Sequence, residues 1–462
     1  MNSGFIDETA IAQTLKDNQS ADAVRIGAIL QRARMLQGIP AADVAALMTV
    51  TDLDLLQDLF NSAQYVKDTI YGKRLVLFAP LYISNLCANE CLYCAFRANN
   101  TALKRRALSQ EEIADEVRQL IGQGHKRVLM VAGEAYPKEG FSYVLKSIET
   151  IYSVVAKSDS IRRVNVNVAP LSVQQFGELK NANIGTYQIF QETYHRQTYA
   201  NVHLAGKKRD YDWRVTAVHR AMEAGINDVG IGVLFGLADW RFEVLALMQH
   251  IASLEQSFGV GPHTISVPRL EPAIGSDIAG NPPFAVSDFD FKKIVAILRL
   301  AVPYTGIIMS TRETAEIRRE SFALGVSQIS AGSRTDPGGY GADHEDTDSG
   351  QFSLGDHRAL DEVIRDVAAM GYIPSFCTGC YRMGRTGADF MDLAKPGEIK
   401  THCEPNGVST FLEYLLDYGS AETKKIGEIL IDKTLDEMVP FAQKRTRAMV
   451  EKIRAGERDV YC

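Results

Sequence analysis

Eight short runs of β-branched and apolar residues recur along the chain, and helical segments of about 10 to 16 residues separate them. Strands that alternate with helices form parallel sheets, because each helix returns the chain to the edge where the next strand starts. The pattern therefore predicts an α/β fold, a parallel (β/α)8 barrel of the TIM type, with a doubly wound open sheet as the alternative. The runs are LVLFAPLYI, KRVLMVAGE, RRVNVNVAP, GTYQIFQET, DVGIGVLFG, HTISVPRL, GIIMSTRE and VSQISAGS.

The segments on either side of these runs divide the chain into three predicted parts. Residues 1–72 carry apolar residues at three- and four-residue spacing and predict an N-terminal helical region. Residues 73–340 form the predicted barrel, and residues 341–462 form a C-terminal extension. Inside the barrel, a capping box predicts the start of a helix and two glycines predict its end; these residues are Ser109, Glu112, Gly122 and Gly124.

Charge and hydropathy exclude several classes of function. The net charge of −7 opposes a nucleic acid or an anionic membrane as the main partner. The opening residues, MNSGFIDETAIAQTLKDN, lack the basic and apolar regions of a signal peptide, and no run reaches the roughly 20 apolar residues that span a bilayer. We therefore expect a cytoplasmic protein, in which clustered cysteines are typical of metal sites rather than of disulfides.

Three cysteines follow the first run, in the spacing C-x3-C-x2-C. Cys87, Cys91 and Cys94 are expected on a loop at the C-terminal face of the barrel, where barrel enzymes carry their chemistry. A structural zinc site needs a fourth ligand, and none is adjacent in the sequence. Three thiolates on a four-iron cluster instead leave one iron open for a small molecule. Buried cysteines, or a zinc site completed at long range, are the alternatives.

Three further cysteines lie in the extension, in the spacing C-x2-C-x22-C. Cys377, Cys380 and Cys403 again supply only three thiolates. His402, beside Cys403, or His357 upstream could complete a Cys3His zinc site. Spacing alone leaves the choice between zinc and an iron–sulfur cluster open.

The first cysteine spacing resembles the signature of the radical S-adenosylmethionine (SAM) enzymes. The resemblance implies that the open iron chelates the amino and carboxylate groups of SAM, which is then split to a 5′-deoxyadenosyl radical. Ala132-Gly133-Glu134 resembles the Gly-Gly-Glu of that family, with Ala in place of the first Gly, and implies contacts to the SAM amino group. Glu192 and Arg214 resemble its contacts to the ribose and carboxylate, although each alone also fits a surface salt bridge.

The extension and several barrel segments resemble the tyrosine-cleaving FeFe-hydrogenase maturases. The likeness implies a lyase that breaks the Cα–Cβ bond of L-tyrosine, releasing p-cresol and dehydroglycine, which becomes carbon monoxide and cyanide. It also implies a second 4Fe–4S cluster with a labile extra iron and free L-cysteine, and delivery of the iron-bound products for assembly of the hydrogenase H-cluster. The segments are CTGCYRMGRTG, FMDLAKPGEI, CEPN, GTYQIFQETYH, GINDVGIGVLFG, GPHTISVPRLEPA and ISAGSRTDPGGY.

Three other residues gain a role from this likeness. His263 is the candidate protein ligand of the extra iron, although a lone histidine in an apolar strand is commonly a core residue. Arg312 and Ser333 lie at the ends of the seventh and eighth runs, where they could hold an amino-acid carboxylate, or join two loops. The implied partners are other hydrogenase maturation proteins and reduced ferredoxin or flavodoxin as electron donor.

Two other functions compete with this interpretation. The 2-iminoacetate synthases of thiamine biosynthesis share the predicted barrel and the cleavage of tyrosine, but they stop at dehydroglycine and lack the second cysteine set. A non-enzymatic iron–sulfur scaffold is the candidate from another class. Such proteins usually bind their clusters with four ligands and need no barrel of this size.

Overall fold

Eight parallel strands close into a barrel in the computed structural model, which describes residues 4–157, 159–341 and 350–462. Neighbouring strands follow chain order, and the last strand pairs with the first through Val76 and Gln328. Each of the eight predicted runs overlaps one of these strands, so the closed barrel is confirmed and the open sheet is wrong. The strands are β1 (Arg74–Ser84), β3 (Arg127–Ala132), β6 (Arg163–Asn167), β7 (Tyr187–Gln188), β9 (Val229–Gly232), β10 (Thr264–Ser266), β11 (Gly306–Met309) and β12 (Val326–Ser330).

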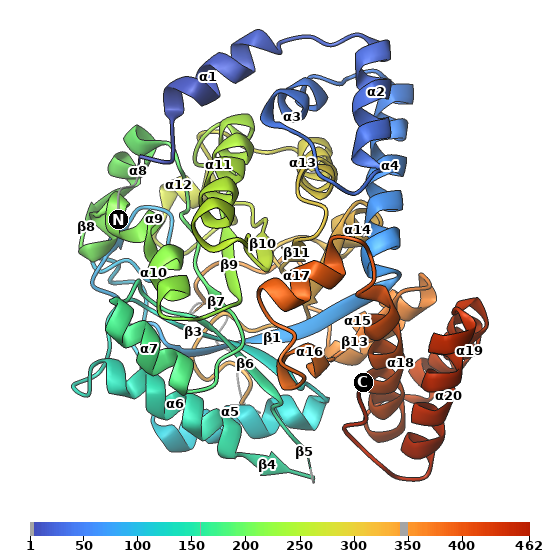
Figure 1. The fold of residues 1–462 in the computed structure, drawn as a ribbon. Coiled ribbons are helices and arrows are strands. Elements are labelled where there is room, and N and C mark those ends of the chain that lie inside the picture. Colours follow the sequence, from blue (N-terminus) through green and yellow to red (C-terminus); the bar gives the residue numbers. More distant parts are fainter. Residues whose placement is uncertain (1–3, 158, 342–349) are drawn as a thin grey trace.

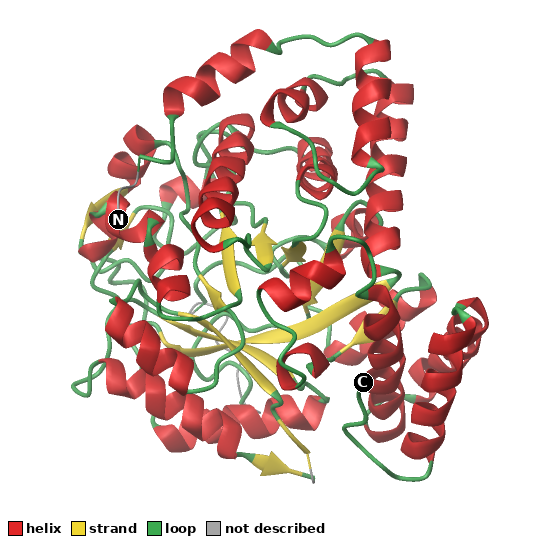
Figure 2. Cartoon of the chain, in the orientation of Figure 1, coloured by secondary structure: helices red, strands yellow, loops and turns green. Residues whose placement is uncertain are grey.

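A helix follows each barrel strand, and these helices surround the sheet (Figure 2). The helix that follows the last strand lies in the segment that the sequence assigned to the C-terminal extension. Residues 342–349, next to the expected boundary, lie outside the described residues. In chain order the helices are α5 (Gln110–Gln123), α6 (Phe141–Ser153), α7 (Val173–Asn181), α10 (Ala217–Glu223), α11 (Trp240–Phe258), α13 (Asp288–Ala301), α14 (Ala315–Phe322) and α15 (Leu360–Ala369).

The predicted capping box starts α5 and Gly124 ends it, whereas Gly122, also predicted to mark its end, lies inside the helix. The Ser109 hydroxyl accepts a hydrogen bond from the Glu112 N–H at 3.2 Å, and the Glu112 carboxylate accepts one from the Ser109 N–H at 2.7 Å. Gly124 ends the helix with φ of 101°, and a Cβ there would lie 2.7 Å from the ring of Tyr414. The predicted capping box is confirmed.

Short elements lie in the loops between the barrel strands and helices. Two of them, β2 and β8, form an antiparallel ribbon that carries Cys91. No helix in the described part of the chain is long and apolar enough to cross a membrane. The short elements are β2 (Glu90–Cys91), β4 (Val155–Ala156), β5 (Asp159–Ser160), α8 (Arg196–Val202), β8 (His203–Ala205), η1 (Lys207–Arg209), α9 (Tyr211–Val215) and α12 (Asp277–Gly280).

Four helices precede the barrel, as the apolar spacing of this region predicts. They are α1 (Glu8–Asp17), α2 (Ala23–Ala33), α3 (Ala41–Met48) and α4 (Leu53–Tyr71). The buried side chains of α4 recur every three or four residues, and this face packs on α13 of the barrel. Because α4 ends three residues before β1 begins, this packing also fixes where the first strand enters the barrel.

A ninth strand, β13 (Ile373–Ser375), joins the sheet from the C-terminal region. It runs parallel to the first three residues of β1, with Arg74 opposite Ile373. The sequence analysis did not predict this strand. Since Cys377 follows two residues later, the pairing places the second cysteine set at the N-terminal end of the barrel. The chain then continues through α16 (Gly379–Arg382), α17 (Ala388–Ala394), α18 (Lys400–Asp417), α19 (Ala421–Glu437) and α20 (Pro440–Arg454).

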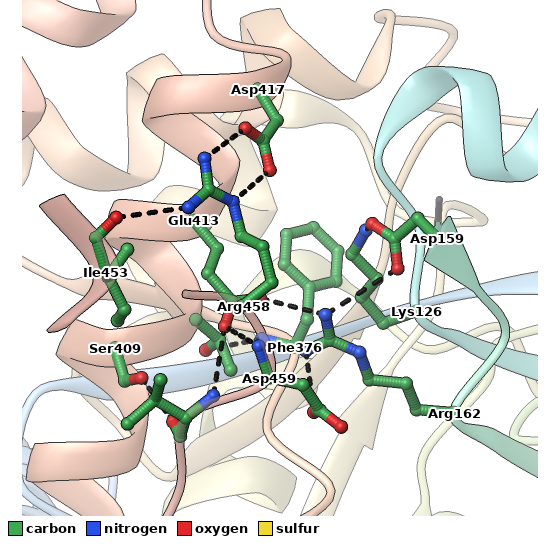
Figure 3. A network of polar contacts seen from close by, with 12 residues as sticks. Lys126, Asp159, Arg162, Phe376, Ser409, Glu413, Asp417, Ile453, Arg458 and Asp459 are labelled. Carbon is green, nitrogen blue, oxygen red and sulfur yellow. Dashed lines mark hydrogen bonds and ion pairs between the residues drawn. The ribbon is translucent and has the colours of Figure 1, made fainter. Parts of the chain in front are cut away.

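A buried ionic network joins the C-terminal tail, α18 and the barrel (Figure 3). Arg162 lies 2.9 Å from Glu413 of α18 and 3.1 Å from Asp459 of the tail. The other Glu413 oxygen accepts hydrogen bonds from the main-chain N–H groups of Asp459 and Val460. Glu413 therefore connects three segments that are far apart in the sequence.

Replacing Glu413 by alanine should loosen the C-terminal region, because it leaves the buried Arg162 without its main partner. We expect a loss of about 3 kcal/mol in the local opening free energy. Hydrogen exchange of residues 400–462 in metal-free protein measures it, with the exposed Glu457→Ala as the matched control. Unchanged protection in both variants would show that the network is not stabilising.

Candidate active site

A large cavity opens at the C-terminal ends of the barrel strands and encloses about 1330 Å³, its mouth included. The first cysteine set lines this cavity, as predicted, on the loop that follows β1. The ribbon of β2 and β8 holds the loop, and the Leu92 N–H donates to the Val202 carbonyl at 3.0 Å. Cys87, Cys91 and Cys94 are thus brought together at the mouth of the barrel.

Burial opposes the charged form of all three thiols. Burial raises the pKa of Cys87 and Cys91 above the usual thiol value and raises the pKa of Cys94 to about 11. Metal binding at this site must therefore displace protons. Among the described residues, no three Cys, His, Asp or Glu side chains close on a single ion. Cysteines of a four-iron cluster need no such convergence, since each binds a different iron.

Alternating charges line the wall beside the thiols. Arg214 lies 2.8 Å from Glu134 and 3.5 Å from Glu192, and Lys208 lies 2.6 Å from Glu192. Burial opposes the charged form of Glu134, but Arg214 and Lys208 more than offset it and lower the pKa of this carboxyl. Glu192 and Arg214 are therefore parts of one buried network rather than of surface salt bridges.

The sequence analysis missed two residues of this wall. The Asn89 amide donates to Glu134 at 2.7 Å, and its oxygen accepts from the Lys208 N–H at 3.0 Å. Asn89 lies between the first two cysteines, a position that could have drawn attention to it. Lys208 lies in the short 3-10 helix η1, and nothing in its sequence context marks it.

Only a glycine fits at position 133 without a steric clash. A Cβ on this residue would lie 2.2 Å from the carbonyl oxygen of Leu86, because the segment packs directly on the loop after β1. The Gly133 N–H donates to the Ser84 carbonyl at 2.9 Å, while Ala132 pairs with Ser84 in the sheet. The alanine at the preceding position fits without a clash of this kind, so Ala132, Gly133 and Glu134 all line the cavity.

Glu192 adopts a strained backbone conformation, with φ of 71°. Its carbonyl accepts from the Leu234 N–H at 2.9 Å, and the next residues are held by the buried carboxyl group of Glu243. Glu243 accepts from the Thr193 hydroxyl and from the Tyr194 N–H. These bonds fix the Glu192 side chain toward Lys208 and Arg214.

Arg312 and Ser333, predicted to act together, are placed differently. Arg312 lines the cavity with its guanidinium 3.2 Å from the centre of the Phe352 ring, and no carboxylate of the described residues lies within ion-pair distance of it. Ser333 is buried and does not line the cavity, and its hydroxyl has no hydrogen-bond partner in the described structure. Thr335, two residues later, does line it.

A second, smaller cavity of about 570 Å³ lies at the N-terminal ends of the strands. It gathers the second cysteine set with His263, as the resemblance implied. His402 and His357, the candidate zinc ligands, do not line it. Burial raises the pKa of Cys380, and raises the pKa of Cys403 to about 12. Its polar lining comprises Tyr71, Arg74, Arg127, Asp228, His263, Ser327, Gln328, Cys377, Thr378, Cys380, Tyr381, Cys403 and Asn406.

His263 presents a neutral ring to this cavity. Burial lowers its pKa, although Asp228 opposes the shift. The Nδ1 atom lies 3.6 Å from the Asp228 carboxylate and has no hydrogen-bond partner in the described structure. Neutral imidazole with an unused nitrogen has the chemistry of a metal ligand.

Alternate residues of β1 connect the two cavities along the inside of the barrel. Arg74 and Val76 line the lower cavity, whereas Phe78, Pro80 and Tyr82 line the upper one. Since side chains alternate between the two faces of a strand, these five positions point inward in succession. The two thiol sites therefore lie at opposite ends of one barrel interior.

The end of the chain folds back beside the lower cavity. The Asn406 side chain binds both the N–H and the C=O of Cys462, at 2.8 and 2.9 Å, and Arg385 donates to the same C=O at 2.7 Å. The Cys462 thiol is buried. Nothing in the sequence pattern indicated this contact.

Comparison with known proteins agrees with this architecture. The Radical SAM superfamily matches residues 81–248, and the Biotin and Thiamin Synthesis associated domain matches residues 266–373. Among curated proteins, 2-iminoacetate synthase of Escherichia coli is 32% identical over 76% of this chain and 90% of its own. The FeFe-hydrogenase maturase subunit HydE of Thermotoga maritima is 24% identical over 57% of this chain and 71% of its own.

Two solved structures match the chain over all or nearly all of its length. A crystal structure of HydG, a maturase of the FeFe-hydrogenase, is 48% identical with a TM-score of 0.96 and full coverage of both chains. HydG from Carboxydothermus hydrogenoformans is 40% identical with a TM-score of 0.85, covering 98% of this chain and 99% of its own. The superfamily implies SAM and a 4Fe–4S cluster, and the thiols and charged wall of the upper cavity fit both groups. The chain is a radical SAM enzyme and belongs to the HydG-type FeFe-hydrogenase maturases.

Proposed function

We propose that this protein cleaves L-tyrosine to p-cresol and dehydroglycine in the upper cavity and forms carbon monoxide and cyanide on iron at the lower one. The iron-bound products would serve assembly of the H-cluster of FeFe-hydrogenase. The observation that carries the proposal is the pair of three-cysteine sites at opposite ends of one barrel. The likeness to HydG over the full chain supports it.

In the upper cavity, Cys87, Cys91 and Cys94 hold the cluster that binds SAM. Together these groups supply, when bound, a 5′-deoxyadenosyl radical that abstracts hydrogen from the substrate. The Ala132-Gly133-Glu134 segment faces the SAM amino group, while Glu192 and Arg214 hold its ribose and carboxylate. The charged wall beside the thiols supports these roles, because its carboxylates and guanidinium are already fixed by one another.

Arg312 binds the carboxylate of tyrosine. Its guanidinium lines the cavity without a carboxylate partner among the described residues. A planar guanidinium can bind a carboxylate through two parallel hydrogen bonds. Ser333, the other residue predicted for the substrate, is buried outside the lining of this cavity, so the proposal for the carboxylate rests on Arg312 alone.

At the lower cavity, Cys377, Cys380 and Cys403 hold the second 4Fe–4S cluster, and His263 binds the additional labile iron together with free L-cysteine. The neutral ring of His263 and its unused Nδ1 support this role. Reduced ferredoxin or flavodoxin supplies electrons, and other hydrogenase maturation proteins receive the product.

A 2-iminoacetate synthase activity that ends at dehydroglycine is the second candidate. The 32% identity to the Escherichia coli enzyme favours it. Products from L-tyrosine labelled in the ring and in the carboxyl group separate the two under strict anaerobiosis. Labelled p-cresol with labelled carbon monoxide supports the proposal, whereas p-cresol without carbon monoxide supports the synthase. If neither p-cresol nor carbon monoxide forms, the result would point to an iron–sulfur scaffold.

The role of Arg312 predicts a specific kinetic change. Arg312→Gln should raise the KM for tyrosine about 30-fold, the equivalent of about 2 kcal/mol, through loss of a charged hydrogen-bond pair. Cleavage of SAM in the absence of tyrosine should persist. Arg319→Gln removes an exposed arginine that pairs with Asp366 and serves as the control. An unchanged KM in Arg312→Gln would remove this residue from the substrate site.

A further inference from the structure

A segment that follows the last barrel strand lies against the loop of the first cysteine set. Gln351 and Phe352 line the upper cavity, although Gln351 and Cys94 are 257 positions apart in the sequence. The Gln351 carbonyl accepts from the Ala95 N–H at 3.4 Å, and the Gln351 N–H donates to the Thr335 carbonyl at 2.9 Å. The main chain of this segment is therefore anchored on both sides without the use of the glutamine side chain.

The Gln351 side chain instead bridges a cysteine sulfur and a buried tyrosine. Its Nε2 lies 3.7 Å from Cys94 Sγ, and its Oε1 accepts from the Tyr82 hydroxyl at 2.8 Å. Tyr82 is buried in β1, with its ring edge-on to Phe96 at 6.0 Å between the ring centres. A thiolate sulfur can only accept hydrogen bonds, so the amide NH2 group faces Cys94 and the amide oxygen faces the hydroxyl.

Hydrogen bonds to the sulfur atoms of an iron–sulfur cluster are among the factors that set its reduction potential. An N–H donor is attracted more strongly to the reduced cluster, because that state carries one more negative charge. Each such donor therefore favours reduction and raises the potential. Cys94 Sγ also has a main-chain donor, the Phe96 N–H at 3.4 Å, so the Gln351 amide is a side-chain addition to a main-chain bond.

We propose that Gln351 is a positioning residue of the upper cavity, which donates a hydrogen bond to the Cys94 thiolate and thereby raises the reduction potential of the cluster held there. The inference rests on the proposed function of Cys87, Cys91 and Cys94 and deepens it. A residue that lies beyond the last barrel strand then regulates how readily this cluster accepts the electron that cleavage of SAM requires.

The test is a redox titration of the anaerobically reconstituted holoenzyme, followed by electron paramagnetic resonance. The signal of the upper cluster is the one that changes when SAM is added. Gln351→Met keeps a similar length without a donor. At a fixed potential it should lower the ratio of reduced to oxidised upper cluster about threefold, which corresponds to a shift of about 30 mV to more negative potential. Gln57→Met is the matched control, since Gln57 is an exposed glutamine of α4 that bonds to Asn61 at 3.0 Å.

A second variant tests the same bond from its other end. Tyr82→Phe keeps the glutamine but removes the hydroxyl that orients its amide, so we expect a smaller shift of the same sign. An unchanged potential in Gln351→Met, or a shift to more positive potential in either variant, would overturn the inference.

Iron content and affinity for SAM separate the remaining outcomes. Both should stay at the wild-type level in Gln351→Met, because the three thiols and the charged wall are unchanged. Loss of iron from this variant would give the side chain a structural role and overturn the inference. A wild-type signal that does not respond to SAM would contradict the proposed function as well, whereas a SAM-responsive signal with an unchanged potential in Gln351→Met contradicts this inference alone.

Discussion

Substitution of Cys91 by alanine is expected to reduce formation of 5′-deoxyadenosine to background. Cys91 is buried within the ribbon of β2 and β8, and its neighbours Cys87 and Cys94 line the same cavity. With two thiols left, the proposed cluster loses one of its three protein ligands, and nothing else in the upper cavity can reduce SAM.

The measurement is SAM cleavage with dithionite under anaerobiosis, with and without tyrosine. Cys380→Ala is the matched control, because it removes one thiol from the other set and should leave SAM cleavage measurable. SAM cleavage at the wild-type rate in Cys91→Ala would refute the assignment of the first cysteine set to the radical chemistry.

Loss of the lower thiol site should separate the two halves of the reaction. The double variant Cys377→Ala with Cys380→Ala is expected to keep p-cresol formation at a reduced level, because the upper cavity and its charged wall remain intact. Carbon monoxide should fall to background, since the proposed iron that receives the two-carbon fragment has lost two of its cluster ligands. Some cyanide can still arise, because dehydroglycine decomposes without that iron.

Parallel assays of p-cresol, carbon monoxide and cyanide test this division. Cys462→Ala is the control: it removes a buried thiol next to the same site but keeps the main-chain bonds to Asn406 and Arg385. Full carbon monoxide output with normal p-cresol in the double variant would assign a structural role to the second set. Truncation near residue 340 is a poorer test, because it would also remove α15 and β13 from the barrel.

The sequence by itself determined the barrel and the position of the first cysteine set on it. Eight separate runs were recognisable because buried parallel strands are almost continuously apolar; every residue of β1, for example, is buried. The spacing of Cys87, Cys91 and Cys94 directly after the first run was sufficient to place them at the C-terminal face. The strands and the first cysteine site could be predicted because each depends on a local sequence pattern and not on residues far away in the chain.

Only the tertiary structure decided how the lower cavity is composed. Arg74, Arg127, Asp228 and His263 come from the starts of four different strands, and closure of the barrel brings them together. The strand β13, which carries the second cysteine set to this end, has three residues and gives too short a pattern to predict. The position of His402 relative to the lower cavity could not be predicted from the sequence either. It adjoins Cys403 in the sequence but does not line the cavity, because consecutive residues of a helix point about 100° apart.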